Sequence, residues 1–433
     1  MKTIIKFPFV VFFLLLLSCQ DKMQVKKTVN VPKYLPYEQL RVPVHSSQPF
    51  SLQKPGKIYL KDDLIFINED LRGIHVFDNS DPSHPVNLGY LDIPGNVDMA
   101  VRGDILYADS YVDLVALDIS DPANIQEVGR AKKIFPYILP PTGNDYPIDY
   151  TKVDETKGVV IGWKVKKVVT DVEITTFPPW YGPYPFLKNT NSFMYSEGMT
   201  LYHGSSGGSG TGIGGSMARF TIVKDWLYAL TDQDLRVINI SDPYHIRKEN
   251  VVNTNSGMET IFPYDTLLFL GSTMGMWIYS LSDPLYPQFL SNYTHIRSCD
   301  PVVVKNDFAY VTLRSGSTCG AEEVNRLDVF DISDPAHIFR RGIYPLQHPY
   351  GLSAYDSALY VCDGEYGMKM YDISDPLRLA RKKTYSDIRG RDVIAWNDVL
   401  IMIGNEGLSQ YRIMENGTLE LLSFIPVSGT PVE

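Results

Sequence analysis

The tripeptide Ser-Asp-Pro recurs six times in the chain, and this repetition constrains the fold more than any other feature of the sequence. The serines of the six copies stand at positions 80, 120, 241, 282, 333 and 374. Successive copies are therefore 40, 121, 41, 51 and 41 residues apart, and the long step is close to three periods. A period near 40 residues is typical of architectures in which every repeat is one supersecondary unit.

Each repeat contains four short runs with the composition of β-strands. In the second copy these runs are residues 99–101, 105–107, 114–117 and 126–129, and the Asp-Pro of the signature separates the last two. Proline presets φ and has no N–H for a central strand, so Asp-Pro predicts a tight turn between the third and fourth strands. Four strands in about 40 residues are one blade of a β-propeller.

We therefore predict an all-β fold, a β-propeller of seven four-stranded blades. The blades are expected at residues 56–94, 96–130, 217–253, 256–294, 299–346, 349–386 and 390–425. An eighth, degenerate blade at 147–174 would fill part of the long step. The alternative is a β-sandwich or a row of small β domains, which is disfavoured because one repeat cannot bury both its faces alone.

The strand before the signature reads Leu-Val-Ala-Leu-Asp at 114–118 and Leu-Asp-Val-Phe-Asp at 327–331. These runs resemble the LVIVD-repeat family of bacterial β-propeller proteins, and the resemblance extends over about residues 56–425. It implies a propeller fold and a surface or exported lipoprotein. It implies no catalytic residue, because the matching positions are structural.

The N-terminus has the pattern of a bacterial lipoprotein signal. Lys2 and Lys6 precede an apolar run at 7–17 that is too short to span a membrane, and Leu-Leu-Ser-Cys ends at Cys19. We expect a signal peptide at 1–18, lipid on Cys19, and a tether at 19–55 whose residues 40–44 could add an edge strand or help to close the ring. The lipid would anchor the protein to a bacterial membrane, the outer in preference to the inner. The alternative is an ordinary signal peptide with an incidental cysteine.

Charge and cysteine usage narrow the class of protein further. The net charge of −10 and the lack of a basic stripe argue against binding to nucleic acid. Cys299 opens the first strand of its blade and Cys319 lies in the loop after the second strand of the same blade, so both reach one side of that blade. We expect a disulfide between them, which export permits; a metal pair is the alternative, although no CxxC is present. Cys362 is expected to be buried.

The loops that a propeller gathers on one face predict where a ligand would bind. The insert at 131–216 connects a fourth to a first strand, and it holds an aromatic–proline run at 177–186 and a Gly/Ser-rich run at 204–215. Long loops in a compact repeat fold are often functional. The candidate ligand-binding residues are these aromatics and the charged residues at the starts of first strands: Trp180, Tyr181, Asp98, Arg219, Glu259, Asp300, Arg391 and Asp392.

These residues, with acidic residues of the second-to-third strand loops such as Glu69 and Asp109, would form an acidic channel mouth. Converging carboxylates could hold calcium or a cationic ligand. The alternative is that they are ordinary solvated turns.

Two classes of function fit this pattern. The first is a non-catalytic binding or scaffold protein of the cell envelope, with a glycan or an envelope protein as its partner and no cofactor unless calcium is bound. The second is a carbohydrate-active or other hydrolase that uses paired carboxylates, such as Asp98 and Asp300, at the channel mouth. A purely structural role in the envelope remains a third possibility. No HExxH motif or HxH pair indicates a zinc or iron site.

Overall fold

The computed structural model describes residues 22–173, 213–216, 218–254, 257–294, 301–316, 324–415 and 417–428. The chain divides into two compact units. The larger comprises Pro36–Tyr137 with Ser196–Glu433, and the smaller comprises Met1–Leu35 with Ile138–Tyr195. In the described ranges, no helix has both the length and the apolar composition needed to cross a lipid bilayer.

The larger unit contains seven antiparallel four-stranded blades, each made from one continuous stretch of chain, and the sheet of the first blade has one further short strand at each edge. Blade 1 consists of β3 (Pro55–Lys61), β4 (Leu64–Glu69), β5 (Gly73–Asp78) and β6 (Val86–Asp92). Blade 2 consists of β7 (Met99–Arg102), β8 (Ile105–Ser110), β9 (Asp113–Asp118) and β10 (Gln126–Ala131). Blade 3 consists of β13 (Phe220–Val223), β14 (Trp226–Leu230), β15 (Asp234–Asn239) and β16 (Arg247–Asn253). Blades 4 and 5 are β17 (Met258–Tyr264), β18 (Leu267–Ser272), β19 (Gly275–Ser280) and β20 (Gln288–Thr294); and β21 (Val302–Lys305), β22 (Phe308–Leu313), β23 (Arg326–Asp331) and β24 (Phe339–Pro345). Blade 6 consists of β25 (Leu352–Tyr355), β26 (Ala358–Cys362), β27 (Met368–Asp372) and β28 (Ala380–Tyr385), with the 3-10 turn η3 (Gly364–Tyr366). Blade 7 consists of β29 (Asp392–Trp396), β30 (Val399–Ile403), β31 (Gly407–Ile413) and β32 (Leu419–Pro426).

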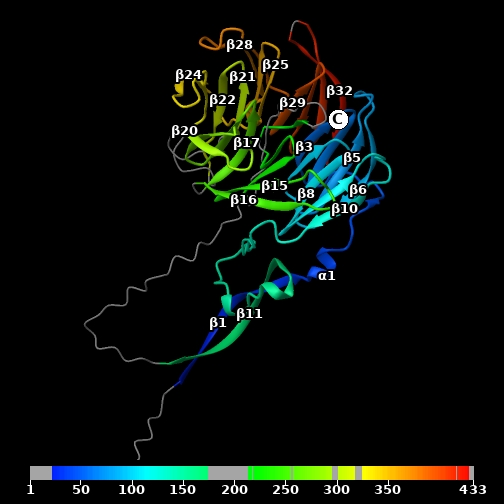
Figure 1. Ribbon diagram of the computed structural model, residues 1–433, viewed down its shortest axis with the longest axis vertical. Coiled ribbons are helices and arrows are strands. Elements are labelled where there is room, and N and C mark those ends of the chain that lie inside the picture. Colours follow the sequence, from blue (N-terminus) through cyan, green and yellow to red (C-terminus); the bar gives the residue numbers. More distant parts are fainter. Residues whose placement is uncertain are drawn as a thin grey trace, which may run out of the picture. The chain divides into compact units, whose positions relative to one another are not determined.

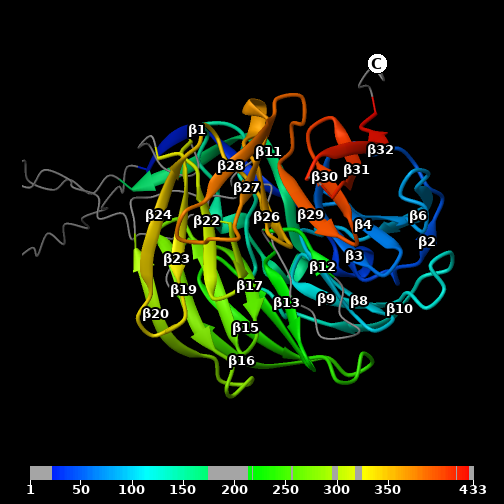
Figure 2. The same cartoon turned by 90° about the horizontal axis from the view of Figure 1, so that it is seen from above.

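The seven blades close into a ring, so the predicted β-propeller is confirmed. The first strand of each blade contacts the first strand of the next from β3 and β7 through to β25 and β29, and β30 of blade 7 contacts β3 of blade 1. Figures 1 and 2 show the consequence: the red strands of blade 7 lie beside the blue strands of blade 1. Side chains contribute to this closure: the Gln410 and Asn79 amides exchange hydrogen bonds, and the Ser423 hydroxyl donates to the Pro82 carbonyl.

The repeated signature folds as two successive side-chain-capped turns. In blade 2, Asp118 Oδ1 accepts the backbone N–H of Ser120 at 2.9 Å, and Asp121 Oδ1 accepts that of Ala123 at 3.2 Å. Aspartate is suited to this turn because its carboxylate reaches its own backbone two residues on. The hydrogen bonds from the Ser120 hydroxyl and N–H also hold the pKa of Asp118 below its ordinary value.

The signature turns also connect neighbouring blades. The hydroxyl of Tyr228 in β14 donates to the Pro284 carbonyl of the next blade at 2.7 Å, and Tyr107 in β8 donates to the Ile240 carbonyl at 3.3 Å. Both tyrosine rings are fully buried. We call the face that carries these turns, together with the turns between first and second strands, the signature face.

The segment before blade 1 is built into the ring. It contains the short helix α1 (Tyr37–Leu40) and β2 (Ser46–Ser47), which extends the sheet of blade 1 by pairing with β6. On its other side Ser46 N–H donates to the Ile125 carbonyl of blade 2 at 2.9 Å, so the strand lies between two blades. Arg41 binds Asp113 of blade 2 through two nitrogens, at 2.7 and 3.1 Å. The added strand therefore falls at 46–47 rather than at 40–44.

The smaller unit is a two-stranded antiparallel ribbon of β1 (Lys22–Leu35) and β11 (Val159–Glu173), with 3-10 turns η1 (Tyr150–Lys152) and η2 (Glu155–Lys157). The prediction of an eighth blade at 147–174 is therefore wrong. Its single long strand pairs with the segment that was expected to be a tether. A partner so distant in sequence leaves no signal in the local alternation of β11, which is why a blade was inferred.

Candidate functional site

Asp98 lies at the start of the inner strand of blade 2, but its carboxylate is fully engaged. It is 3% exposed and accepts a 2.5 Å charged hydrogen bond from Lys57 Nζ of blade 1. Its oxygens also accept the backbone N–H groups of Met99 at 2.8 Å, of Phe220 at 3.2 Å and of Arg219. Since Arg219 and Phe220 lead into blade 3, this carboxylate joins three blades rather than facing a ligand.

The acidic residues of the second-to-third strand loops have a similar structural role. Asp109 Oδ1 accepts the backbone N–H groups of Val97 and Asp98, both at 2.8 Å, and thereby fixes the loop that positions Asp98. Burial raises the pKa of Asp109 to about 6, against the opposing effect of those N–H donors. Glu69 accepts the N–H groups of Gln53 and Lys54 in the same way. Asp98, Asp109 and Glu69 thus cap backbone N–H groups instead of lining an open acidic channel mouth.

The centre of the ring holds a segment of the chain itself. The two-residue strand β12 (Ile213–Gly214) pairs with the inner strand β3, in the register Ile213 to Leu60 and Gly214 to Tyr59. Beyond it, the Ser216 N–H donates to Asp392 Oδ1 of blade 7 at 3.3 Å, and Ser216 Oγ accepts the Leu352 N–H of blade 6 at 2.8 Å. The Asp392 carboxyl therefore contacts the last residues of the insert and does not line an open channel.

Of the remaining predicted site residues, the structure describes some and not others. Glu259 is buried at the start of β17, and Arg391 precedes β29, where its N–H donates to the Ile403 carbonyl. Asp300, Trp180, Tyr181, Cys19 and the Cys299–Cys319 pair lie outside the described residues. Cys362 is a free, buried thiol. Among the described residues no group of three or more His, Cys, Asp or Glu side chains is arranged to hold a metal ion.

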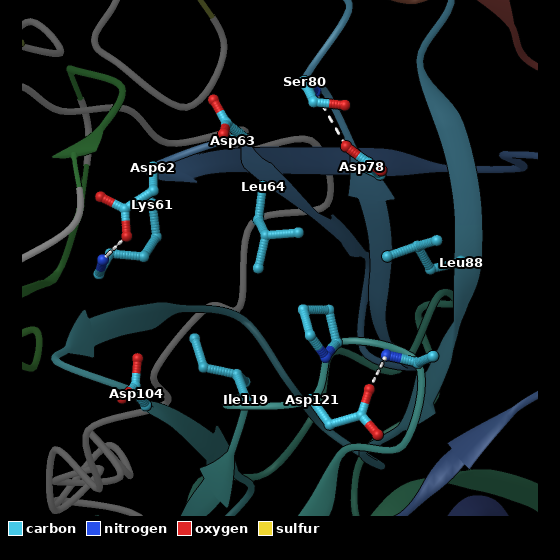
Figure 3. A pocket seen from close by; sticks show the side chains of 12 residues that line it. Lys61, Asp62, Asp63, Leu64, Asp78, Ser80, Leu88, Asp104, Ile119 and Asp121 are labelled. Atoms are coloured by element: carbon cyan, nitrogen blue, oxygen red, sulfur yellow. Dashed lines mark hydrogen bonds and ion pairs between the residues drawn. The ribbon is translucent and has the colours of Figure 1, made fainter.

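An open concavity of the larger unit lies on the signature face, between blades 1 and 2 (Figure 3). It has a volume of about 480 Å³. Leu64, Leu88 and Ile119 form its apolar floor, and five carboxylates surround them: Asp62, Asp63, Asp78, Asp104 and Asp121. Lys61 is the one basic residue of the lining, and it is ion-paired with Asp62.

The register of the outer strands explains why this junction is open. The residue that follows the β-bulge of the fourth strand usually meets the turn of the next blade: Asn250 donates to the Leu285 carbonyl and Ser291 to the Pro335 carbonyl. In blade 1 this residue is Gly89, which lies against the Ser47 carbonyl of β2. The inserted strand thus takes the place of the contact between the outer strand of blade 1 and the signature turn of blade 2. The sequence alone gave no signal of this replacement.

A family model supports the assignment of the repeat. The model described as LVIVD repeat matches residues 95–132 and 296–345, which contain blade 2 and blade 5. The chain therefore contains LVIVD repeats in these two regions, within a seven-bladed β-propeller. No curated protein sequence matches it.

Solved structures similar to this LVIVD-repeat propeller include two lactonase-type proteins. The periplasmic gluconolactonase of Pseudomonas aeruginosa has a TM-score of 0.51 and 10% identity, over 86% of this chain and 96% of that one. A candidate 6-phosphogluconolactonase of Bacteroides uniformis has a TM-score of 0.49 and 12% identity, over 87% and 98%. At such identities the likeness shows the propeller fold alone.

Proposed function

We propose that the LVIVD-repeat propeller is a non-catalytic binding protein of the bacterial cell envelope, anchored through lipid on Cys19, and that it binds a basic segment of an envelope protein on its signature face. The observation that carries this proposal is the concavity between blades 1 and 2. Its lining holds five carboxylates and one lysine, and that lysine is already paired.

The chemistry of the concavity matches a lysine or arginine side chain. Such a side chain has an apolar stem that packs on aliphatic surface and a cationic head that seeks carboxylates. Leu64, Leu88 and Ile119 would receive the stem, and Asp63 and Asp104 the head. Neither aspartate has a charged partner at salt-bridge distance among the described residues. Surface carboxylates also steer a basic partner towards the site over about 8 Å in physiological salt.

The binding proposal is preferred over the hydrolase because of the state of Asp98. A general acid or nucleophile needs a carboxyl group that can reach substrate. Asp98 is instead covered by Lys57 and by three backbone N–H groups. The glycan that the acidic channel mouth was expected to bind would meet Ser216 and Gly215 there instead.

Site-specific photo-crosslinking in intact cells tests the proposal with a matched control. The motif Asp-Ile-Ser-Asp-Pro-Ala occurs twice, ending at Ala123 beside the concavity and at Ala336 in blade 5. A photo-reactive residue at 123 should give a discrete protein adduct that a residue at 336 does not give. The adduct should decrease about tenfold in the Asp63→Asn/Asp104→Asn variant and should keep its yield in Asp307→Asn, which lies in the corresponding turn of blade 5.

Identical adducts from positions 123 and 336 would contradict the proposal, as would an adduct at 123 that is insensitive to the two asparagine substitutions. The anchor is tested separately by mass spectrometry of the mature N-terminus, where an unmodified Cys19 would exclude it.

A further inference from the structure

The last residues of the insert occupy a defined seat at the centre of the propeller. Residues 213–214 pair with β3, the Gly215 N–H is 3.4 Å from the Ile58 carbonyl, and Ser216 contacts blades 6 and 7. The inner strands β25, β29 and β3 of three consecutive blades therefore hold this segment. We call residues 213–216 the channel segment.

The Asp392 carboxyl lies directly against the channel segment. It is 0% exposed, and its Oδ1 accepts the Ser216 N–H. A Cβ added to Gly215 would overlap Asp392 Oδ2, so only glycine allows the two groups to lie this close. Among the residues that the structure describes, none makes a hydrogen bond to Asp392 Oδ2.

The groups around Asp392 do not compensate an ionised carboxylate. Lys57 on β3 is the nearby cation whose field favours ionisation, but its ammonium group is bound to Asp98. The other neighbours are the buried Cys362 thiol on β26, the uncharged Ser216 on the channel segment and the preceding residue Arg391. Burial raises the pKa of Asp392 well above its ordinary value, while the Val393 N–H, Lys57 and Ser216 oppose the shift. The environment beside the channel segment therefore favours the protonated, neutral form of the Asp392 carboxyl.

We propose that the channel segment is a pH-sensitive latch, which is seated while the Asp392 carboxyl carries a proton and is released when that carboxyl ionises. Release hydrates the carboxylate and exposes the inner edge of β3. This inference is independent of the proposed partner at the concavity, since that site lies on the signature face between blades 1 and 2 and shares no residue with the latch.

The direction of the pH effect follows from linkage. The seated state binds the proton of Asp392 more tightly than the released state, because only the seated state buries the group. Seating is thus favoured most fully below the ordinary carboxyl pKa of about 4 and weakens as pH rises towards the raised pKa of the seated state. In this window each rise of one pH unit lowers the equilibrium constant between the released and the seated state by about tenfold.

Hydrogen–deuterium exchange of the full chain between pH 5 and pH 9 tests the latch. The protection factors of the Gly215 and Ser216 amides, corrected for the intrinsic exchange rate, should fall as the pH rises, by about tenfold per pH unit until the pH reaches the raised pKa of the seated carboxyl. Those of β14, which contains no carboxylate, serve as the reference and should stay constant. In Asp392→Asn, whose side chain is neutral at every pH, protection of the channel segment should not depend on pH.

Two further variants keep the test decisive. Asp363→Asn changes another fully buried carboxyl, but that group is 3.3 Å from Lys369 Nζ, so this variant should retain the wild-type pH profile. Gly215→Ala should remove protection of residues 215–216 at every pH while β14 remains protected, which gives an answer even if Asp392→Asn does not fold. Constant wild-type protection from pH 5 to pH 9, or the same profile in Asp392→Asn, would overturn the proposal.

Discussion

The Lys57–Asp98 pair should be one of the strongest single contributors to stability in the ring. Lys57 Nζ and Asp98 Oδ2 are 2.5 Å apart, and the two side chains are only 6% and 4% exposed. Burial lowers the pKa of Lys57, while the Asp98 carboxylate opposes that shift by favouring the charged ammonium. Removing one partner of a buried pair leaves an uncompensated charge, which costs about 3–5 kcal/mol. We therefore expect Lys57→Met to lower the free energy of unfolding by about that amount.

A surface pair in the same part of the chain provides the control. Lys54 Nζ and Asp70 Oδ2 are 2.6 Å apart, but their side chains are 73% and 34% exposed. Exposed pairs contribute less than about 1 kcal/mol, so Lys54→Met should be nearly neutral. Lys54 and Lys57 are three residues apart in the sequence and receive the same substitution, so the main difference between the two variants is the burial of the ion pair.

Urea denaturation followed by tryptophan fluorescence measures the difference. Lys57→Met should shift the midpoint to lower urea at an unchanged slope. The double variant Lys57→Met/Asp98→Asn should recover part of the loss, because the buried charge is then gone, with a coupling energy of about 1–3 kcal/mol. If Lys57→Met costs no more than Lys54→Met, the pair does not hold the blades together and Asp98 is again a candidate ligand-binding residue.

Three more outcomes are expected from the contacts between and within blades. Tyr228→Phe removes the donor to the turn of the next blade and should lower the free energy of unfolding, measured by urea denaturation, by about 1 kcal/mol. Tyr360→Phe should leave it unchanged, because the Tyr360 hydroxyl has no hydrogen-bond partner among the described residues. Equal losses in the two variants would contradict the interblade role of Tyr228. Gly129→Ala would drive a Cβ into the Pro243 carbonyl of blade 3 and should cost about 1–3 kcal/mol, so an unchanged melting temperature would count against that close contact. Asp372, whose pKa the Ser374 hydroxyl and N–H and the Lys382 ammonium lower to about 2, stabilises the fold above its ordinary pKa and loses this effect as the pH falls towards 2. Asp372→Asn should therefore show a smaller fall in melting temperature between pH 7 and pH 3 than the wild type, and an identical fall would refute the assignment.

The site could be predicted from sequence only as a set of strand ends. Asp98, Glu259, Arg391 and Asp392 do stand at or beside the starts of inner strands, because the repeat spacing fixes where each strand begins. Their partners could not be predicted. The distance from Lys57 to Asp98 depends on how blade 1 packs on blade 2, and the contact of Ser216 with Asp392 spans 176 residues.

The repeat pattern by itself determined the propeller fold and the positions of the blades, because turn chemistry and strand alternation are local. Six blades carry both signals, and the seventh is marked by its strands alone. Tertiary structure alone decided which charges remained available. It buried Asp98 and Asp392 among blades distant in sequence, paired β11 with β1 instead of building another blade, and opened a concavity where Ser46–Ser47 separates blades 1 and 2. The physical reason is that burial and pairing of a charge depend on which residues the closed ring brings into contact with it, and local sequence does not contain that information.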